Sequence, residues 1–291
     1  MKIPILGTGL SGLVGTRVME LLEYKYDFTD LSFKTGVDIT DYDQVFNVCD
    51  GSAAKTILHM AAKTDVDGCE DDKMLGEDGP AYMVNVEGTK NIVNTAKKLN
   101  LRVIYISTDF VFDGTKDFYT EEDEPNPVNW YGYTKREGEM TVVGADISHA
   151  VVRLSYPYRS SFDERTDFVR RIMEKMAKGE KLLSLTDHIF TPTFIDDIAG
   201  ALDMLIEREF QSIFHVVGSQ NLTPYEATGM IAKTFNLKGK YEKVTRQAYF
   251  AGRAFRPCRL ALKNDKITKL GAKMRRFDEG LMEMKKQLAL L

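Results

Sequence analysis

The feature that most constrains the fold is an alternation between short apolar runs and longer segments whose apolar residues recur at helical spacing. The short runs predict strands over residues 2–6, 28–33, 56–60, 103–107, 150–154 and 213–217. The longer segments predict helices over residues 13–22, 82–99, 131–142 and 195–206. Strands that alternate with helices pair in parallel, and helices then cover both faces of the sheet. The sequence therefore predicts an α/β fold with a doubly wound parallel sheet.

Beyond Gly218 the pattern changes to helical segments with little strand. This region opens with Thr223-Pro224-Tyr225-Glu226, in which Thr223 can cap a helix, Pro224 suits its first turn and Glu226 can complete a capping box. We expect a smaller, mostly helical C-terminal lobe. Two polar stretches, residues 69–80 and 113–129, contain glycine or proline and are expected to form loops.

Composition excludes several classes of protein. The net charge of -4 gives no general basic field for a polyanion, so we expect no nucleic-acid partner. The three cysteines form no CxxC pattern, which indicates neither a disulfide framework nor a metal site. The N-terminal apolar stretch is too short for a secretory signal, and no apolar run reaches the length of a membrane span. We therefore expect a cytoplasmic protein with no membrane partner.

A glycine-rich segment, Gly7-Thr8-Gly9-Leu10-Ser11-Gly12-Leu13-Val14-Gly15, follows the first predicted strand and precedes a helical pattern. Glycines at such a turn let the backbone approach a pyrophosphate, which the amides and dipole of the helix N-terminus then stabilise. A GxGxxG motif alone is a weak signal, but its place after the first strand of an alternating chain favours a dinucleotide site.

The adenosine half of a dinucleotide cofactor is normally recognised by residues at the end of the second strand. That region is Leu31-Ser32-Phe33-Lys34, which contains no acid. Lys34 could pair with a 2′-phosphate, which favours NADPH, although an exposed lysine at the start of a loop explains it equally well. Asp38 follows closely and could instead contact the adenosine.

A tyrosine and a lysine four residues apart, Tyr131 and Lys135, begin a predicted helix and so share one of its faces. A nearby ammonium lowers the pKa of a tyrosine, which would make Tyr131 a usable proton donor near neutrality. None of the other tyrosines has a lysine at this spacing. Ser107-Thr108-Asp109 ends the fourth predicted strand, at the sheet edge where open α/β folds bind ligands.

Together these segments resemble an extended short-chain dehydrogenase/reductase, and most closely the dTDP-4-dehydrorhamnose reductase family. The resemblance covers nearly the whole chain. It rests on seven segments in order: TGLSGLVG at 8–15, VDITD at 37–41, HMAAKTDVD at 59–67, STDFVFDG at 107–114, YGYTK at 131–135, TPT at 191–193 and RP at 256–257. By this resemblance, residues 1–156 and 191–218 form the dinucleotide-binding Rossmann domain, and residues 157–190 and 219–291 form the substrate-binding lobe.

The resemblance also implies roles for individual residues. Thr108, Tyr131 and Lys135 would be catalytic. Substrate contacts would come from Thr64, Thr108, Asp109, Tyr156 and His188. NADPH or NADH would be bound by Gly9, Leu10, Ser11, Gly12, Leu13, Val14, Gly15, Lys34, Asp38, Ile39, Ala61, Ala62, Lys63, Tyr131 and Lys135. Two positions depart from the family pattern: Tyr156 stands where a tryptophan is usual, and Asp167 where an asparagine is frequent. An aspartate beside a diphosphate would be repulsive, which leaves the substrate open.

Three functions remain open at this point. The first is reduction of the C4 keto group of a nucleotide-linked 4-keto-6-deoxy sugar, with conversion of dTDP-4-dehydro-L-rhamnose to dTDP-L-rhamnose as the first expectation. The second is an NADP-binding regulatory subunit similar to the β subunit of methionine adenosyltransferase, which shares this fold and the STDxVFDG and YGxTK segments. The third is a sugar-nucleotide epimerase or dehydratase. The sequence leaves the oligomeric state open, with a homodimer among the options.

Overall fold

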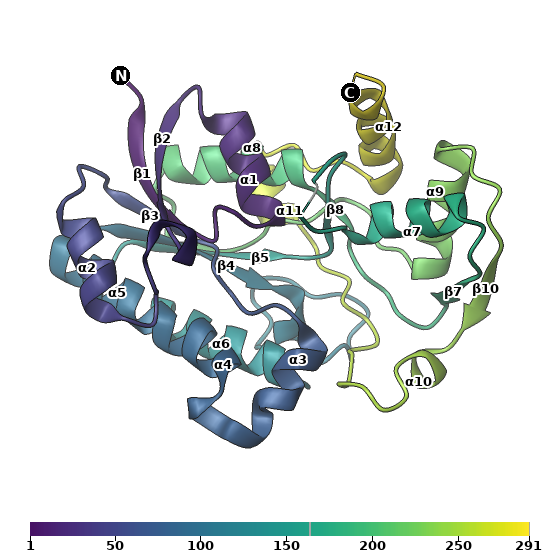
Figure 1. Ribbon diagram of the computed structural model, residues 1–291, viewed down its shortest axis with the longest axis horizontal. Helices are drawn as coiled ribbons and strands as arrows, with labels where there is room; N and C mark the ends of the chain where they lie inside the picture. The colour runs from purple at the N-terminus through teal and green to yellow at the C-terminus, as the bar shows by residue number, and fades with distance from the viewer. Residues whose placement is uncertain (163, 291) are drawn as a thin grey trace.

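Six parallel strands form the central sheet, in the order β2-β1-β3-β4-β5-β9 (Figure 1). The chain is seen in a computed structural model that describes residues 1–162 and 164–290. In chain order the strands are β1 (Ile3–Thr8), β2 (Tyr26–Leu31), β3 (Thr56–His59), β4 (Arg102–Thr108), β5 (His149–Leu154) and β9 (Ser212–His215). All six predicted strands are confirmed, with ends that differ by one or two residues.

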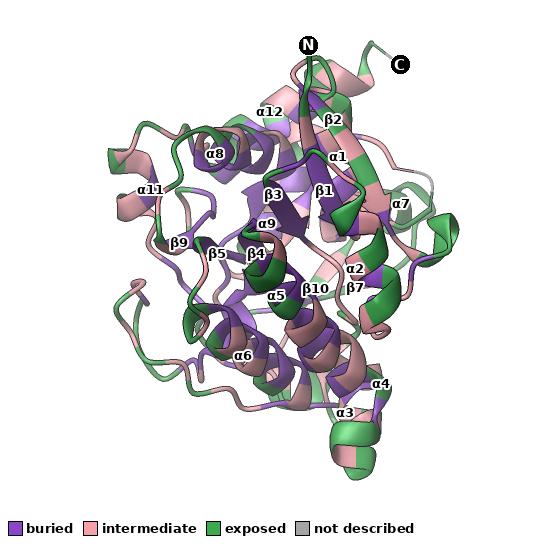
Figure 2. Cartoon of the chain, turned by 90° about the vertical axis from the view of Figure 1, so that its left-hand side faces the viewer, coloured by how far each residue is buried: buried purple, intermediate pink, exposed green. Residues whose placement is uncertain are grey.

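Helices cover both faces of this sheet, as the doubly wound prediction required (Figure 1). One face carries α1 (Leu13–Leu22) and α8 (Ile195–Glu207), which pack on each other. The opposite face carries α2 (Tyr42–Asp50), α5 (Gly88–Leu99) and α6 (Trp130–Val143). Buried residues concentrate in the strands and on the helix sides that face them (Figure 2). The sheet therefore lies between two apolar layers, and the loops that follow the strands lie at its carboxyl edge.

A second group of elements packs beside the carboxyl edge of the sheet (Figure 1). Its helices are α7 (Phe168–Ala177), α9 (Pro224–Thr234), α10 (Arg246–Tyr249) and α12 (Phe277–Leu288), and α11 (Asp265–Lys269) lies near β9. Two small parallel pairs accompany them: β6 (Pro157–Tyr158) with β8 (Thr193–Phe194), and β7 (Leu182–Leu185) with β10 (Tyr241–Val244). The predicted capping box is confirmed, because Thr223 accepts from the Glu226 amide and Glu226 accepts from that of Thr223. No helix within the described residues is long and apolar enough to cross a bilayer.

The loop predicted over residues 69–80 is wrong. The chain forms α3 (Val66–Asp71), a 3-10 segment (Asp72–Asp78) and α4 (Pro80–Tyr82), and then a π-helical turn (Met83–Glu87) leads into α5. The Asp72 carboxylate supports these turns because it accepts hydrogen bonds from the Ala81 amide and the Lys63 ammonium. Gly76 has φ +57° and only kinks the chain between helical turns.

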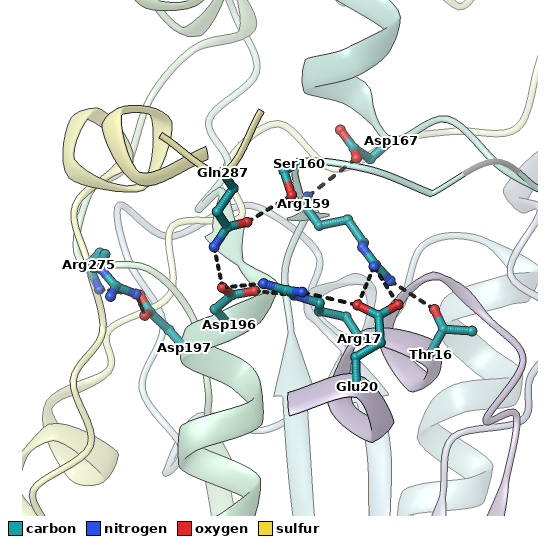
Figure 3. A network of polar contacts seen from close by, with 10 residues as sticks. All are labelled: Thr16, Arg17, Glu20, Arg159, Ser160, Asp167, Asp196, Asp197, Arg275 and Gln287. Carbon is teal, nitrogen blue, oxygen red and sulfur yellow. Dashed lines mark hydrogen bonds and ion pairs between the residues drawn. The ribbon is translucent and has the colours of Figure 1, made fainter. Parts of the chain in front are cut away.

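A polar network joins α1 and α8 to the second group of elements (Figure 3). Arg17 of α1 forms two hydrogen bonds to Asp196 of α8, at 2.7 and 2.9 Å. Gln287 of α12 donates to the same carboxylate across 2.7 Å. Arg159, which follows β6 and is buried, pairs with Glu20 of α1 at 2.7 Å. The helix that follows the glycine-rich segment is thereby tied to the C-terminal elements.

Candidate active site

The glycine-rich segment connects β1 to α1 in a turn that requires glycine at two positions. Gly9 has φ +67°, and a Cβ there would lie 2.6 Å from the Ala61 amide nitrogen. At Gly15 a Cβ would lie 2.5 Å from the Gly9 carbonyl oxygen. The N-cap residue of α1 is Gly12, and no side chain caps this end of the helix. Its first amides are therefore available to an anion, which fits the pyrophosphate of a dinucleotide.

Thr8 and His59 fix the loop after β3 against this turn. The Thr8 hydroxyl accepts from the amides of Met60 and Ala61, at 3.2 and 3.0 Å, and lies 2.7 Å from Nδ1 of His59. Nε2 of His59 contacts the Thr89 hydroxyl at 3.0 Å. Burial lowers the pKa of His59 to about 3, so the ring is neutral at neutral pH. Ala61, Ala62 and Lys63, predicted to contact the nicotinamide side, are thus held beside Gly9.

Asn85, in the π-helical turn, supports the same loop. Its side chain accepts from the Lys63 amide at 2.8 Å and donates to the Lys63 carbonyl at 3.1 Å and to the Thr134 hydroxyl at 2.9 Å. The Lys63 ammonium points toward Asp72 and the Gly68 carbonyl instead. Asn85 was missed in the sequence because it is one polar residue in a predicted helix. The backbone of Lys63 is therefore bonded to Asn85 and its ammonium to Asp72, which fixes this residue in the loop.

The end of β2, where the adenosine of the cofactor is expected, contains an acid that the sequence prediction overlooked. The second strand ends at Leu31, two residues earlier than predicted, and Asp30 lies in it opposite Gly7. One carboxylate oxygen accepts from Ser32 at 2.6 Å, and the other is buried without a partner in the described part of the chain. Lys34, predicted to bind the 2′-phosphate, is exposed and pairs with Glu164 at 3.0 Å.

Asp38 and Ile39 lie further along the same connection. The Asp38 carboxylate accepts from the amide and hydroxyl of Thr40, at 2.9 and 2.8 Å. Ile39 is buried in the apolar layer under α2 and α5, where it contacts Gly88. The Asp38 carboxylate is therefore engaged in a turn, and the Ile39 side chain is packed in the protein interior. Only part of each residue is left to contact an adenosine.

Thr108, Tyr131 and Lys135 lie where the end of β4 packs against α6. Thr108 ends β4, and Tyr131 and Lys135 lie in the first turns of α6. The side chain of Asn129 caps α6 by accepting from the Gly132 amide at 2.8 Å. A Cβ at Gly132 would collide with the Phe110 carbonyl, so α6 packs directly on the turn after β4. The Thr108 hydroxyl lies near the Tyr131 phenol and donates to the Asp109 carboxylate at 3.1 Å.

The predicted pKa shift of Tyr131 has the wrong sign. Burial raises the pKa of Tyr131 above its ordinary value, and the contact with Thr108 only partly offsets this. Lys135 is itself buried, which lowers its pKa to about 7, and its ammonium lies 4.1 Å from the centre of the Tyr105 ring. An ammonium that is only partly protonated near neutrality gives little stabilisation to a tyrosinate. The sequence could not reveal this, because it does not report burial.

Asp109 is a buried carboxyl beside these residues. It accepts hydrogen bonds from Ser155 at 2.7 Å and from Thr108 at 3.1 Å. Among residues 1–162 and 164–290, no lysine or arginine forms an ion pair with it. Burial raises the pKa of Asp109 to about 7. Asp109 is therefore divided between a neutral and a charged form near physiological pH.

The remaining residues predicted to bind substrate lie on the side of the C-terminal elements. Thr64 is exposed and accepts from Arg165 at 3.3 Å. Tyr156 directly follows Ser155, and its hydroxyl lies 3.1 Å from Nε2 of His188. Tyr156 packs against the apolar cluster that contains Tyr131 and also against the cluster that contains Phe190.

Asp167 is not the repulsive neighbour of a diphosphate that the sequence indicated. Its buried carboxylate caps α7 by accepting from the amides of Val169 and Arg170, at 3.0 and 3.1 Å. The Arg170 guanidinium forms an ion pair with it at 2.7 Å. The charge is thus compensated within α7, where a helix N-terminus favours an anion.

The fold and this arrangement define an NAD(P)H-dependent oxidoreductase with the fold of the extended short-chain dehydrogenases/reductases. A family model described as "RmlD substrate binding domain" matches residues 1–290, and the chain belongs to this family. The predicted resemblance is therefore confirmed, as is a nicotinamide dinucleotide as cofactor.

Three similar proteins illustrate the range of this family. Methionine adenosyltransferase 2 subunit beta from Mus musculus is 29% identical over 96% of this chain and 86% of its own length. dTDP-4-dehydrorhamnose reductase from Aggregatibacter actinomycetemcomitans is 31% identical over 76% of each chain. The crystal structure of dTDP-4-dehydrorhamnose reductase from Bacillus anthracis in complex with NADP has a TM-score of 0.90 and 27% identity, and covers 99% of this chain and 100% of that one.

Proposed function

We propose that this protein reduces the C4 keto group of a nucleotide-linked 4-keto-6-deoxy sugar, with dTDP-4-dehydro-L-rhamnose as substrate and dTDP-L-rhamnose as product. The observation that carries the proposal is that Thr108, Tyr131 and Lys135 lie where β4 and α6 pack together, in the same parallel sheet whose strand β1 leads into the glycine-rich turn. The likeness to dTDP-4-dehydrorhamnose reductases in sequence and fold supports the choice of substrate.

The cofactor would be held by the residues that the turn and the neighbouring loop present. The amides at the start of α1 would bind the pyrophosphate, and the loop of Ala61, Ala62 and Lys63 would border the nicotinamide. When bound, NADPH or NADH supplies a hydride to the carbonyl carbon. The sugar nucleotide would lie between the Rossmann domain, residues 1–156 and 191–218, and the lobe of residues 157–190 and 219–291.

The proton of the reaction comes from Tyr131. As the carbonyl carbon gains a hydride, its oxygen becomes an alkoxide and takes the phenolic proton. Because burial raises the pKa of Tyr131, the phenol keeps this proton until an alkoxide forms. Thr108 lies beside the phenol, and its hydroxyl, which donates to Asp109 in the structure, would turn to donate a hydrogen bond to the same oxygen and stabilise the developing charge. Lys135 would hold the cofactor ribose.

The direct test is oxidation of NADPH and NADH at 340 nm with dTDP-4-keto-6-deoxy sugar generated in place. It is run with and without the 3,5-epimerase that supplies the L-rhamno configuration. We expect turnover that requires the epimerase. Turnover without it would move the proposal to a different ketosugar, and absence of turnover with intact cofactor binding would refute it.

A second candidate is a regulatory subunit of the methionine adenosyltransferase type. The observation that favours it is the length of the match to the mouse β subunit, 96% of this chain against 76% for the reductase from Aggregatibacter. It predicts copurification with a methionine adenosyltransferase, cofactor binding and no turnover of any ketosugar. Reduction of a ketosugar at an ordinary enzymatic rate would exclude it as the main function.

A further inference from the structure

Tyr105 lies in the middle of β4, and its buried side chain packs against α6. The ammonium nitrogen of Lys135 lies over its ring, 4.1 Å from the ring centre. The Tyr105 hydroxyl donates to the Lys135 carbonyl at 3.4 Å, so the tyrosine contacts both the side chain and the backbone of the same residue. A Cβ at Gly138 would collide with this hydroxyl, and the glycine therefore lets α6 approach the ring. The contact is built by two separate elements of the fold.

Lys135 carries its ammonium in surroundings that disfavour a charge. The residue is 2% exposed, and burial lowers its pKa to about 7. Among residues 1–162 and 164–290 it forms no ion pair. Glu139, one turn later in α6, raises the pKa of Lys135 through its charge, but its carboxylate is already paired with Arg153 at 2.7 Å. The negative face of an aromatic ring is a further group that can stabilise a buried cation.

The other ionisable groups around this contact add no second negative charge. His59 of β3 lies with its ring centre 5.5 Å from that of Tyr105, and it is neutral because burial lowers its pKa to about 3. Tyr131, one turn before Lys135 in α6, keeps its proton because burial raises its pKa. The positive charge of Arg153 on β5 is compensated by Glu139. The ring face of Tyr105 and the charge of Glu139 are therefore the groups that favour the charged form of Lys135.

We propose that Tyr105 is a positioning residue that holds Lys135 in its charged form through a cation–π contact. Its part in the reaction rests on the proposed function, in which the ammonium would bind the cofactor ribose and must carry its charge before the cofactor arrives. A cation over an aromatic face gains more in a dry interior than at a surface. Burial raises the pKa of Tyr105, so the phenol is neutral and acts through its ring face, not as an anion.

The test changes the charge of the ring face and keeps its shape. Tyr105→Phe removes only the hydroxyl, and pentafluorophenylalanine at the same position has nearly the same shape, but its fluorines withdraw electron density from the ring face. Carbon-13 NMR of labelled lysine follows the titration of Lys135, with Lys135→Met to assign the signal. We expect the pKa of Lys135 to stay within about 0.3 unit of the wild type in Tyr105→Phe and to fall by about one unit in the fluorinated protein. A pKa that is the same in both variants overturns the proposal, because a ring that only fills space acts alike in both.

The pH profile of turnover separates this inference from the reductase proposal. If the reaction needs a charged Lys135, kcat/KM falls as the pH rises through the pKa of Lys135 in the free enzyme. This fall should begin about one pH unit lower in the fluorinated protein than in Tyr105→Phe. The NMR shift without turnover of any keto sugar would refute the reductase and retain the cation–π contact. Turnover with the same pH profile in both variants would refute the role of Tyr105 in the reaction and retain the reductase.

Discussion

Asn85 donates its side-chain amide to the hydroxyl of Thr134 across 2.9 Å, in a contact where both residues are fully buried. This contact joins the π-helical turn before α5 to the helix that carries Tyr131 and Lys135. Because the same amide group also pairs with the backbone of Lys63, it sets the loop after β3 relative to α6. Asn85 is thus a positioning residue for both halves of the proposed site.

Asn85→Ala should lower the free energy of unfolding by about 2–3 kcal/mol, because it leaves buried backbone and hydroxyl groups without partners. The loosened loop at Lys63 should also weaken cofactor binding several-fold. The matched control is Asn91→Ala, which loses a single hydrogen bond to the Ile39 carbonyl and should cost about 1 kcal/mol. Urea unfolding and NADPH titration measure the two effects. Equal losses in both variants would contradict the role of Asn85.

Tyr131→Phe should abolish most turnover, by about 10²- to 10⁴-fold in kcat, because the carbonyl oxygen loses its proton donor. NADPH affinity should stay within about twofold of the wild type, since the ring and its packing on Phe110 remain. Tyr133→Phe is the control: this ring stacks on Trp130 at 4.9 Å and is 37% exposed. Activity retained in Tyr131→Phe would remove Tyr131 from the acid role.

Much of the fold could be predicted because its signals are local. The helix over residues 13–22 matches α1 to the residue, since a glycine turn precedes it and one apolar stripe faces the sheet. Other elements gave no such signal. β10 has no buried residue and becomes a strand only by pairing with β7, which is far away in the sequence. α2 buries only Val45 and Cys49, too few for a helical period to stand out.

The candidate site was predictable where motifs carry it and not where tertiary packing does. Thr108, Tyr131 and Lys135 stand in recognisable segments, and the structure brings them to one edge of the sheet. The sign of the Tyr131 shift depends on burial, which no motif reports. Asp30 was overlooked because the predicted end of its strand was two residues too late. An error of that size changes which side chain is expected to meet the adenosine.

Lys34→Ala should weaken NADPH more than NADH, by at most about fivefold, because an exposed ion pair with the 2′-phosphate is worth little. Lys34→Arg keeps the charge and serves as the control. Fluorescence titration with each reduced cofactor gives the dissociation constants. Equal weakening of both cofactors would show that Lys34 does not read the 2′-phosphate.

Asp30→Ala should have the opposite effect on the cofactor preference. The partly exposed Asp30 carboxylate can accept from a ribose hydroxyl and would repel a 2′-phosphate. Its removal should therefore shift the ratio of affinities toward NADPH by about tenfold, or about 1.4 kcal/mol. The same fluorescence titration measures this ratio. An unchanged ratio would show that Asp30 does not face the adenosine ribose.

Asp109 should make the protein less stable as the pH rises from about 4 to about 7. Its pKa is raised to about 7 in the folded state, against about 3.9 in an unfolded chain. A raised pKa gives stability that is complete below about pH 4 and is lost progressively up to about pH 7. Relative to Asp109→Asn, the free energy of unfolding of the wild type should fall by roughly 2–4 kcal/mol over that range. Urea unfolding from pH 4.5 to 8 measures it. Asp113→Asn is the control and should show no such change over this range, because hydrogen bonds from Tyr119 and Thr115 hold the pKa of Asp113 below its ordinary value despite partial burial, so the carboxylate is ionised in both the folded and the unfolded chain. A pH-independent difference for Asp109→Asn would mean that Asp109 stays ionised in the folded protein.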